Sequence, residues 1–289
     1  MFQDIDRLFV FGCSFSQWGT PTWADILATH LNIEYYNYAS GGAGNQFIFT
    51  KLQQADIHYK FTHKDLVIVQ WTNIRREDRF FERDDKWITP GNIYNQNLYN
   101  DNYVDNYVND SNSALRDYTL IYAASQMLHH KTNFKFLQMV DIFETLDQWD
   151  EDTSMSPVLQ SIIDFYKPHL KPLLSESFYQ ILWDNDMENK RQSVKTEFHP
   201  DYNDYHPSIL EHGNFVKQVF DLQFRDDLWD SVINADQYFK NLVNDHFETD
   251  NSPNSVGNMF SMYGDEIHLN IRAPFHENLI SRQLAAIST

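Results

Sequence analysis

The feature that most constrains the fold is a regular alternation of short apolar runs with amphipathic stretches in the first half of the chain. The runs at 8–11, 33–39, 66–70 and 134–140 have strand length, while 23–31, 47–59 and 114–129 carry apolar residues at helical spacing. Strands that alternate with helices in this way are typical of βαβ units with a parallel sheet. The sequence therefore predicts an α/β fold, a three-layer α/β/α sandwich around a parallel sheet.

Two later segments depart from this pattern. Residues 87–113 are rich in Asn and Tyr and too polar for a core element, which predicts a long insertion. Such an insertion is either a lid or binding loop or a plain surface excursion. Residues 156–174 predict a helix interrupted by Pro168 and Pro172, and 208–224 predict an amphipathic helix.

The chain is expected to divide into a domain at 1–225 and a C-terminal extension at 226–289. The extension begins with apolar residues at helix-like spacing through Val243, and such a stripe must be buried against something. The apolar positions after it follow no single period and make a poor independent core. The extension is therefore expected to dock on its own domain, on a second copy in a homo-oligomer, or on a larger assembly.

Charge and cysteine content restrict the classes of partner. The chain has 22 Lys and Arg against 41 Asp and Glu, a net charge of -19, which argues against nucleic acid and anionic membranes. The single cysteine, Cys13, excludes an internal disulfide and a Cys-based zinc cage. No apolar run is long enough to span a bilayer, and the N-terminus lacks the basic region of a signal peptide. We therefore expect synthesis in the cytoplasm.

Three short motifs follow the first three predicted strands. Ser14 comes directly after the first and is either a nucleophile at a cleft or the cap of the next helix. The glycine-rich turn around Gly42 follows the second, where backbone N–H groups can hold an oxyanion, and its alternative is an ordinary turn. Asn73 follows the third and can donate a side-chain hydrogen bond into the same cleft.

A fourth motif, DYHPS, precedes the helix expected at 208–224. A carboxylate close to the imidazole of His206 can orient it and stabilise its protonated form, as a general base requires. Asp204 is the favoured acid and Asp201 the alternative. A lone histidine is more often structural than catalytic. Because His199, His206 and His212 lie close together in the sequence, a metal site is a further, less favoured alternative.

In their order and placement these motifs resemble the SGNH (GDSL-like) esterase and lipase superfamily, and within it divergent members encoded by bacteriophages. The resemblance spans about 8–224. It implies a flavodoxin-like fold, Ser14 as nucleophile, His206 as base and Asp204 as orienting acid, with no cofactor or metal. It also implies an oxyanion hole made by Ser14, Gly42 and Asn73.

The chain departs from the family pattern at several positions. Cys13 stands where the GDS motif has Asp, and Asn203 stands where the DxxH arrangement has its acid. The GxND block is Trp71-Thr72-Asn73-Ile74, without its Gly and its final Asp. An α/β-hydrolase fits less well, because the GxSxG elbow is absent.

The resemblance implies a serine esterase that removes acyl groups, acetyl above all, from carbohydrate. The alternative is a non-catalytic structural or carbohydrate-binding component of a phage particle, attached through 226–289 and located in the virion. Arg75, Arg76 and Asn45 are assigned to substrate binding. The cluster of Arg75, Arg76 and Arg79 suits an anionic or polyhydroxylated substrate, but salt bridges to neighbouring acids are the favoured explanation. These acids are Glu77, Asp78, Glu82, Asp84 and Asp85.

Overall fold

A computed structural model describes residues 4–95, 99–143, 156–186, 190–191, 194 and 204–249 of the chain. Its central sheet has five parallel strands in the order β2-β1-β3-β6-β7. They are β1 (Arg7–Phe11), β2 (Glu34–Asn37), β3 (Asp65–Trp71), β6 (Asn133–Gln138) and β7 (Leu174–Ser177). This order is the doubly wound, flavodoxin-like one, in which ligands bind at the carboxyl ends of the strands where the order reverses. The reversal lies between β1 and β3, and the predicted fold class is confirmed.

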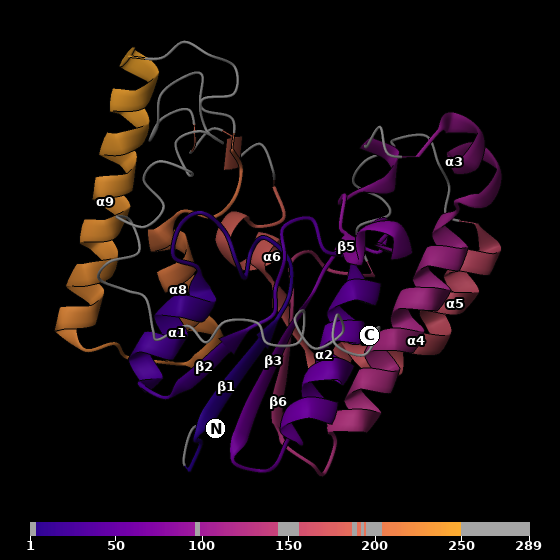
Figure 1. Cartoon of the computed structure of the whole chain (residues 1–289), viewed down its shortest axis with the longest axis horizontal. Helices are drawn as coiled ribbons and strands as arrows, with labels where there is room; N and C mark the ends of the chain where they lie inside the picture. The colour runs from indigo at the N-terminus through magenta and orange to yellow at the C-terminus, as the bar shows by residue number, and fades with distance from the viewer. Residues whose placement is uncertain are drawn as a thin grey trace.

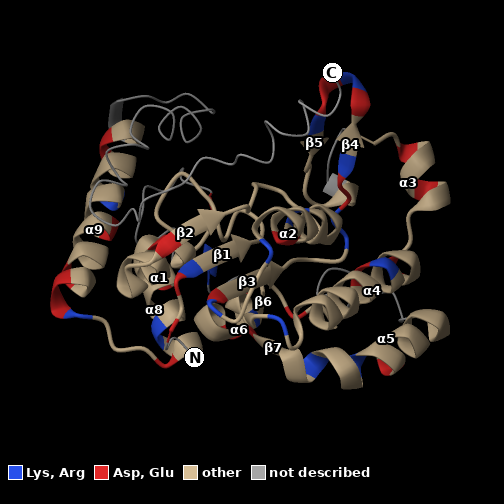
Figure 2. Ribbon diagram, turned by 60° about the horizontal axis from the view of Figure 1, so that its bottom comes forward, with Lys and Arg blue, Asp and Glu red and all other residues tan. Residues whose placement is uncertain are grey.

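Helices cover both faces of this sheet, as Figures 1 and 2 show. One face carries α1 (Trp23–Leu31) and α8 (Ile209–Phe220); the other carries α2 (Asn45–Tyr59), α4 (Asp110–Leu128) and α5 (Pro157–Leu170). The short α6 (Phe178–Trp183) follows β7 and packs against α8. Every residue of β3 is buried. A strand covered on both faces needs apolar residues on both sides, which explains the unbroken apolar runs of β1 and β3.

The predicted helices and strands in the first half are present, with ends shifted by a few residues. The segment 156–174 differs from its prediction, because α5 continues through Pro168 and ends at Leu170. A 3-10 turn, η3 (Lys171–Leu173), holds Pro172, and the edge strand β7 follows. The sequence LSES of β7 is short and largely polar, as an edge strand permits, so no apolar run marked it as a strand.

The predicted polar insertion is partly structured. Within its bounds lie η2 (Ile93–Asn95) and α3 (Asp101–Tyr107), and α4 begins before its end. The antiparallel hairpin of β4 (Arg79–Phe81) and β5 (Lys86–Ile88), with η1 (Glu82–Asp84) at its turn, comes just before it and overlaps its first two residues. Figure 1 shows β5 and α3 beyond the carboxyl ends of the sheet strands. Tyr99, just before α3, and Tyr103 and Tyr107 on α3 form a row of rings with centroids 5.4 and 5.8 Å apart.

The first part of the C-terminal extension is the helix α9 (Asp226–Thr249), which packs against α8 and α1. Its apolar side chains, including Leu228, Val232 and Phe239, form a second buried cluster with Ile26 of α1 and Ile209 of α8. This part of the extension thus docks on its own domain, whereas residues 250–289 lie outside the described residues. Among the helices described, none is long and apolar enough to cross a membrane.

Candidate active site

Ser14 lies in a tight turn at the carboxyl end of β1. The Cys13 carbonyl accepts hydrogen bonds from the Ser16 and Gln17 N–H groups, at 2.9 and 3.2 Å, which folds the chain back on itself. A Cβ atom at Gly12 would lie 2.4 Å from the Ser16 hydroxyl, so this turn requires glycine there. The N-cap of α1 is Thr22 rather than Ser14, which excludes helix capping as the role of Ser14.

The Ser14 turn is fixed by its neighbour Ser16. The Ser16 hydroxyl donates to the Gln70 side chain at 2.6 Å and accepts from the Trp23 indole N–H at 3.1 Å. Its carbonyl accepts from the Asn37 amide at 2.7 Å. Ser14 is itself buried, and its hydroxyl and its N–H form no hydrogen bond to another described residue. The fold therefore holds this serine in place without engaging its polar atoms.

Gly42 and Asn73 lie on the two loops that flank this turn. Gly42 has φ +71°, and a Cβ atom there would lie 2.1 Å from the Thr89 carbonyl oxygen, so only glycine fits. Asn73 accepts the Arg75 N–H with its Oδ1 at 2.7 Å, and this bond fixes the amide plane. Neither the Gly42 N–H nor the Asn73 amide nitrogen donates to another described residue. Both remain available as donors at the switch point of the sheet.

Asp204 and His206 form a tightly coupled pair in the segment before α8. The Asp204 Oδ1 lies 2.5 Å from the His206 Nδ1 and also accepts the His206 backbone N–H at 3.0 Å. Burial alone would raise the pKa of the Asp204 carboxyl, but the hydrogen bonds from His206 and Trp18 outweigh burial and lower it. Asp204 is therefore ionised at neutral pH and orients the imidazole.

Trp18, from the loop after Ser14, completes this pair. Its indole N–H donates to the Asp204 Oδ2 at 3.1 Å, and its rings stack on the His206 imidazole with centroids 3.8 Å apart. The Phe15 ring also contacts the imidazole, with centroids 5.5 Å apart. Two residues of the loop that carries Ser14, Phe15 and Trp18, thus contact His206. No hydrogen bond joins Ser14 to His206 in the described structure.

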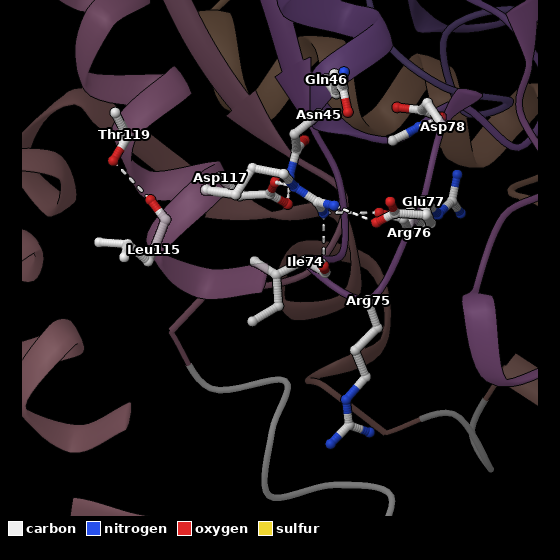
Figure 3. A network of polar contacts seen from close by, with 12 residues as sticks. Asn45, Gln46, Ile74, Arg75, Arg76, Glu77, Asp78, Leu115, Asp117 and Thr119 are labelled. Carbon is white, nitrogen blue, oxygen red and sulfur yellow. Dashed lines mark hydrogen bonds and ion pairs between the residues drawn. The ribbon is translucent and has the colours of Figure 1, made fainter. Parts of the chain in front are cut away.

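Asn45 is fully buried and makes internal hydrogen bonds rather than facing a ligand. Its amide nitrogen donates to the Thr72 carbonyl at 3.0 Å and to Asp117 at 2.8 Å, and its oxygen accepts the Thr72 N–H at 2.9 Å. Figure 3 shows Asn45 beside Asp117 within this network. Because Thr72 precedes Asn73, the Asn45 amide fixes the backbone that presents the Asn73 side chain.

Asp117 and Arg116 connect this network to α4. The two side chains form an ion pair at 2.6 Å, and Arg116 also pairs with Glu77 and donates to the Arg76 carbonyl at 2.9 Å. Burial raises the pKa of Asp117 to about 6, against the attraction of Arg116 and the hydrogen bond from Asn45. The network thus anchors the loop after β3 to a helix on the outer layer.

Asp78 fastens the same loop to the glycine-rich turn. Its carboxylate accepts the Gly44 and Phe47 N–H groups, each at 2.8 Å, at the N-terminus of α2. Gly42 and Asn73 therefore lie on loops that Asp78 and Asn45 hold together.

We expect Asn45→Ala to lower the free energy of unfolding by about 2–4 kcal/mol, because it leaves the Thr72 N–H and the Asp117 carboxylate buried without this partner. Chemical denaturation followed by circular dichroism measures the change. Asn106→Ala removes an amide that bonds only to Asn102 on the exposed α3 and serves as the control. An equal effect of the two substitutions would contradict the structural role of Asn45.

The predicted arginine cluster separates into different environments. Arg75 forms a bidentate pair with Asp110, at 2.9 and 2.8 Å, and its side chain extends away from the network in Figure 3. Arg79 pairs with Glu77 at 2.5 Å. The expected salt bridge to a neighbouring acid is thus present for Arg79, whereas Arg75 pairs with an acid of α4 that is distant in the sequence. Arg76 has no such pair and is treated below.

The remaining histidines of the DYHPS region stay apart from the pair. His212 is fully buried on α8, with the Phe178 ring 5.9 Å away, and burial lowers its pKa well below the usual value. His199 and Asp201 lie outside the described residues. The absence of a metal site and the preference for Asp204 over Asp201 as the orienting acid therefore stay predictions. Asp204 has the geometry that an orienting acid requires.

No protein-family model matches the sequence, and no curated protein matches it. Among solved structures, 75% of the chain aligns with 97% of a member of the lipolytic protein G-D-S-L family from Veillonella parvula, at 12% identity and a TM-score of 0.43. The same share of the chain aligns with 63% of an acetyl xylan esterase from the rumen bacterium Butyrivibrio proteoclasticus, at 13% identity and a TM-score of 0.37. The functional assignment therefore depends on the residues of this chain.

Sequence reasoning missed Trp18 and the buried network of Asn45, Asp117 and Asp78. Trp18 lies four residues after Ser14 and about 190 residues from its partners, so no local pattern marks it. Asp78 and Asp117 are two of 41 acidic residues, and no local pattern distinguishes them. Only burial, which depends on tertiary packing, distinguishes them from the others.

Proposed function

We propose that this protein is a serine-dependent carboxylic ester hydrolase. The observation that carries the proposal is the Asp204–His206 pair, which Trp18 and Phe15 hold against the loop of Ser14 at the switch point of the sheet. An ionised carboxylate on Nδ1 leaves Nε2 as the basic nitrogen, which a general base needs. A serine with unengaged polar atoms next to such a pair suits nucleophilic catalysis.

In the proposed mechanism, His206 takes the proton of the Ser14 hydroxyl as this hydroxyl attacks the ester carbonyl. The Ser14 and Gly42 N–H groups and the Asn73 amide stabilise the oxyanion of the tetrahedral intermediate. His206 then protonates the departing alcohol, and water hydrolyses the acyl-enzyme with His206 again as base. Asp204 holds the imidazole in the required tautomer and stabilises its charged form.

The proposed substrates are acylated, in the first instance acetylated, carbohydrates. The Tyr99–Tyr103–Tyr107 row and the exposed Phe80 and Tyr94 support this choice, because such rings stack on sugar faces. Incubation with 4-nitrophenyl acetate and with acetylated glucose tests the proposal through acetate release. We expect release from both, and no release from either at micromolar protein would reject the esterase.

The alternative is a non-catalytic protein with this fold, structural or carbohydrate-binding, as in a phage particle. The observation that favours it is the missing hydrogen bond between Ser14 and His206. Catalytic hydrogen bonds are often long before substrate binds, so this geometry is also compatible with an esterase. Binding of acetylated glucose without acetate release would support the alternative.

We expect Asn73→Asp to lower kcat about 10²–10³-fold with a small effect on KM, because it removes one oxyanion donor. The substitution keeps the Oδ1 that accepts the Arg75 N–H, so the local turn is preserved. Asn92→Asp is a matched control, since the Asn92 Oδ1 accepts the Tyr94 N–H at 3.0 Å in the same way. Steady-state kinetics on 4-nitrophenyl acetate compares them, and equal activity of the two variants would exclude Asn73 from the oxyanion hole.

Trp18 is expected to act as a positioning residue for the Asp204–His206 pair. Trp18→Phe keeps a ring on the imidazole and loses the donor to Asp204, while Trp18→Leu loses both. We expect kcat to be highest in the wild type, lower in Trp18→Phe and lowest in Trp18→Leu. The stacking itself should stabilise the charged imidazole by about 0.5–2 kcal/mol. A larger loss for Phe than for Leu would contradict the stacking role.

A further inference from the structure

Arg76 lies where the loops that carry Ser14, Gly42 and Asn73 meet. Its Nη1 donates to the Ala43 carbonyl at 3.0 Å, directly after Gly42, and its Nη2 lies 3.4 Å from the Met139 Sδ. The same sulfur contacts the Cys13 Sγ at 3.7 Å and the Thr72 Oγ1 at 3.6 Å. Cys13 precedes Ser14, and Thr72 precedes Asn73. The guanidinium therefore contacts the residue after Gly42, and the sulfur beside it contacts the residues that precede Ser14 and Asn73.

Arg76 differs from the neighbouring arginines in its partners. Among the described residues, no carboxylate lies within 4.0 Å of its guanidinium, whereas Arg75 pairs with Asp110, and Arg79 and Arg116 pair with Glu77. A thioether is a weak acceptor, and a guanidinium has five N–H donors in a planar fork. Asp78 attracts Arg76 from beyond 4.0 Å, and its two carboxylate oxygens accept the Gly44 and Phe47 N–H groups instead. In a chain with 41 acidic residues and 22 basic ones, a half-buried cation at the switch point that no described carboxylate contacts is a candidate site for an anion.

Tyr179 of α6 is a second possible donor, because it contacts Met139 as Arg76 does. Its backbone N–H donates to the Met139 carbonyl at 3.3 Å, and its ring lies 6.1 Å from Phe15 and 5.0 Å from Trp183. Burial raises the pKa of its phenol to about 12, although the nearby charge of Arg76 opposes this. The hydroxyl therefore keeps its proton at neutral pH. The Tyr179 hydroxyl makes no hydrogen bond to another described residue, so it can donate to a ligand.

We propose that Arg76, with Tyr179, binds a carboxylate carried by the ester substrate close to the scissile bond. The inference builds on the proposed esterase and narrows its substrates to acidic esters. A guanidinium binds a carboxylate through two parallel hydrogen bonds, and a charge-assisted pair in a half-buried site is stronger than a neutral one. Because the chain as a whole repels anions, recognition of an acidic substrate requires a local cation of this kind.

Two pairs of substrates test this and locate the carboxylate. The first pair, 4-nitrophenyl hydrogen succinate and 4-nitrophenyl butyrate, differs on the acyl side; the second, acetylated glucuronic acid and acetylated glucose, differs on the alcohol side. We expect wild-type kcat/KM to favour the acidic member of one pair about tenfold to one-hundredfold. Arg76→Gln should abolish that ratio, and Arg76→Lys should keep part of it. Arg83→Gln, which removes an exposed arginine of η1, should leave it unchanged.

The outcomes separate this inference from the proposed function. Hydrolysis of neutral and acidic esters at equal kcat/KM, or an unchanged ratio in Arg76→Gln, overturns the carboxylate site and leaves the esterase intact. If no ester is hydrolysed, the proposed esterase function is rejected. Binding of acetylated glucuronic acid, measured by calorimetry, then tests the carboxylate site on its own. Binding that weakens at least about tenfold in Arg76→Gln but not in Arg83→Gln then supports it, and equal binding overturns it.

Discussion

Ser14→Ala is expected to lower kcat for 4-nitrophenyl acetate by about 10⁴-fold or more while the protein remains folded. Loss of a nucleophile from a triad removes the covalent pathway altogether, and only the oxyanion donors and binding remain. The unfolding free energy should change by less than about 1 kcal/mol, because the Ser14 hydroxyl makes no hydrogen bond that the folded protein loses.

Ser161→Ala on the exposed face of α5 is the matched control for this experiment and should leave kcat unchanged. The triad acts as a unit, so Ser14→Ala combined with His206→Gln should be no slower than Ser14→Ala alone. Additive losses in the double variant, or turnover retained by Ser14→Ala, would show that another group attacks the ester.

Asp204→Asn is expected to lower kcat by about 10⁴-fold. An amide at this position can still accept one hydrogen bond, but it does not stabilise the charged imidazole and it permits the wrong tautomer. Asp201→Asn should lower kcat only slightly. A greater sensitivity of Asp201 would transfer the role of orienting acid to that residue.

The pH dependence of stability gives an independent test of Asp204. Its pKa in the folded state is lowered, so its ionised form adds stability above the unfolded-state pKa of about 4, and this contribution is lost as pH falls through the folded-state value. The difference in unfolding free energy between wild type and Asp204→Asn should therefore narrow as pH falls below about 4. A difference that is constant with pH would contradict the coupling between Asp204 and His206.

The sequence predicts much of this fold because the buried strands leave a simple pattern. β1 and β3 are covered on both faces and read as unbroken apolar runs, and the residues after them necessarily meet at one edge of a parallel sheet. This is why the sequence alone predicts that Ser14, Gly42 and Asn73 lie close together. The sequence did not predict β7, because an edge strand does not require an unbroken apolar run.

Contacts between distant side chains explain the rest. Asn45 and Arg75 have side chains that are common in binding sites. In the folded protein, however, Asn45 forms hydrogen bonds with Thr72 and Asp117, and Arg75 forms an ion pair with Asp110. Arg76 has the same local sequence context as Arg75 and a different environment. Arg75 reaches Asp110 of α4, whereas Arg76 contacts Ala43 and Met139 in two loops, and no sequence spacing encodes this difference.

Covalent labelling by a fluorophosphonate probe tests the central claim most directly, because it reports an activated serine without knowledge of the substrate. We expect stoichiometric labelling of the wild-type protein, with the adduct located on Ser14 by peptide mass spectrometry. Labelling should be absent in Ser14→Ala and strongly slowed in His206→Gln. A wild-type protein that does not react, or a Ser14→Ala variant that reacts equally well, would contradict the proposed nucleophile.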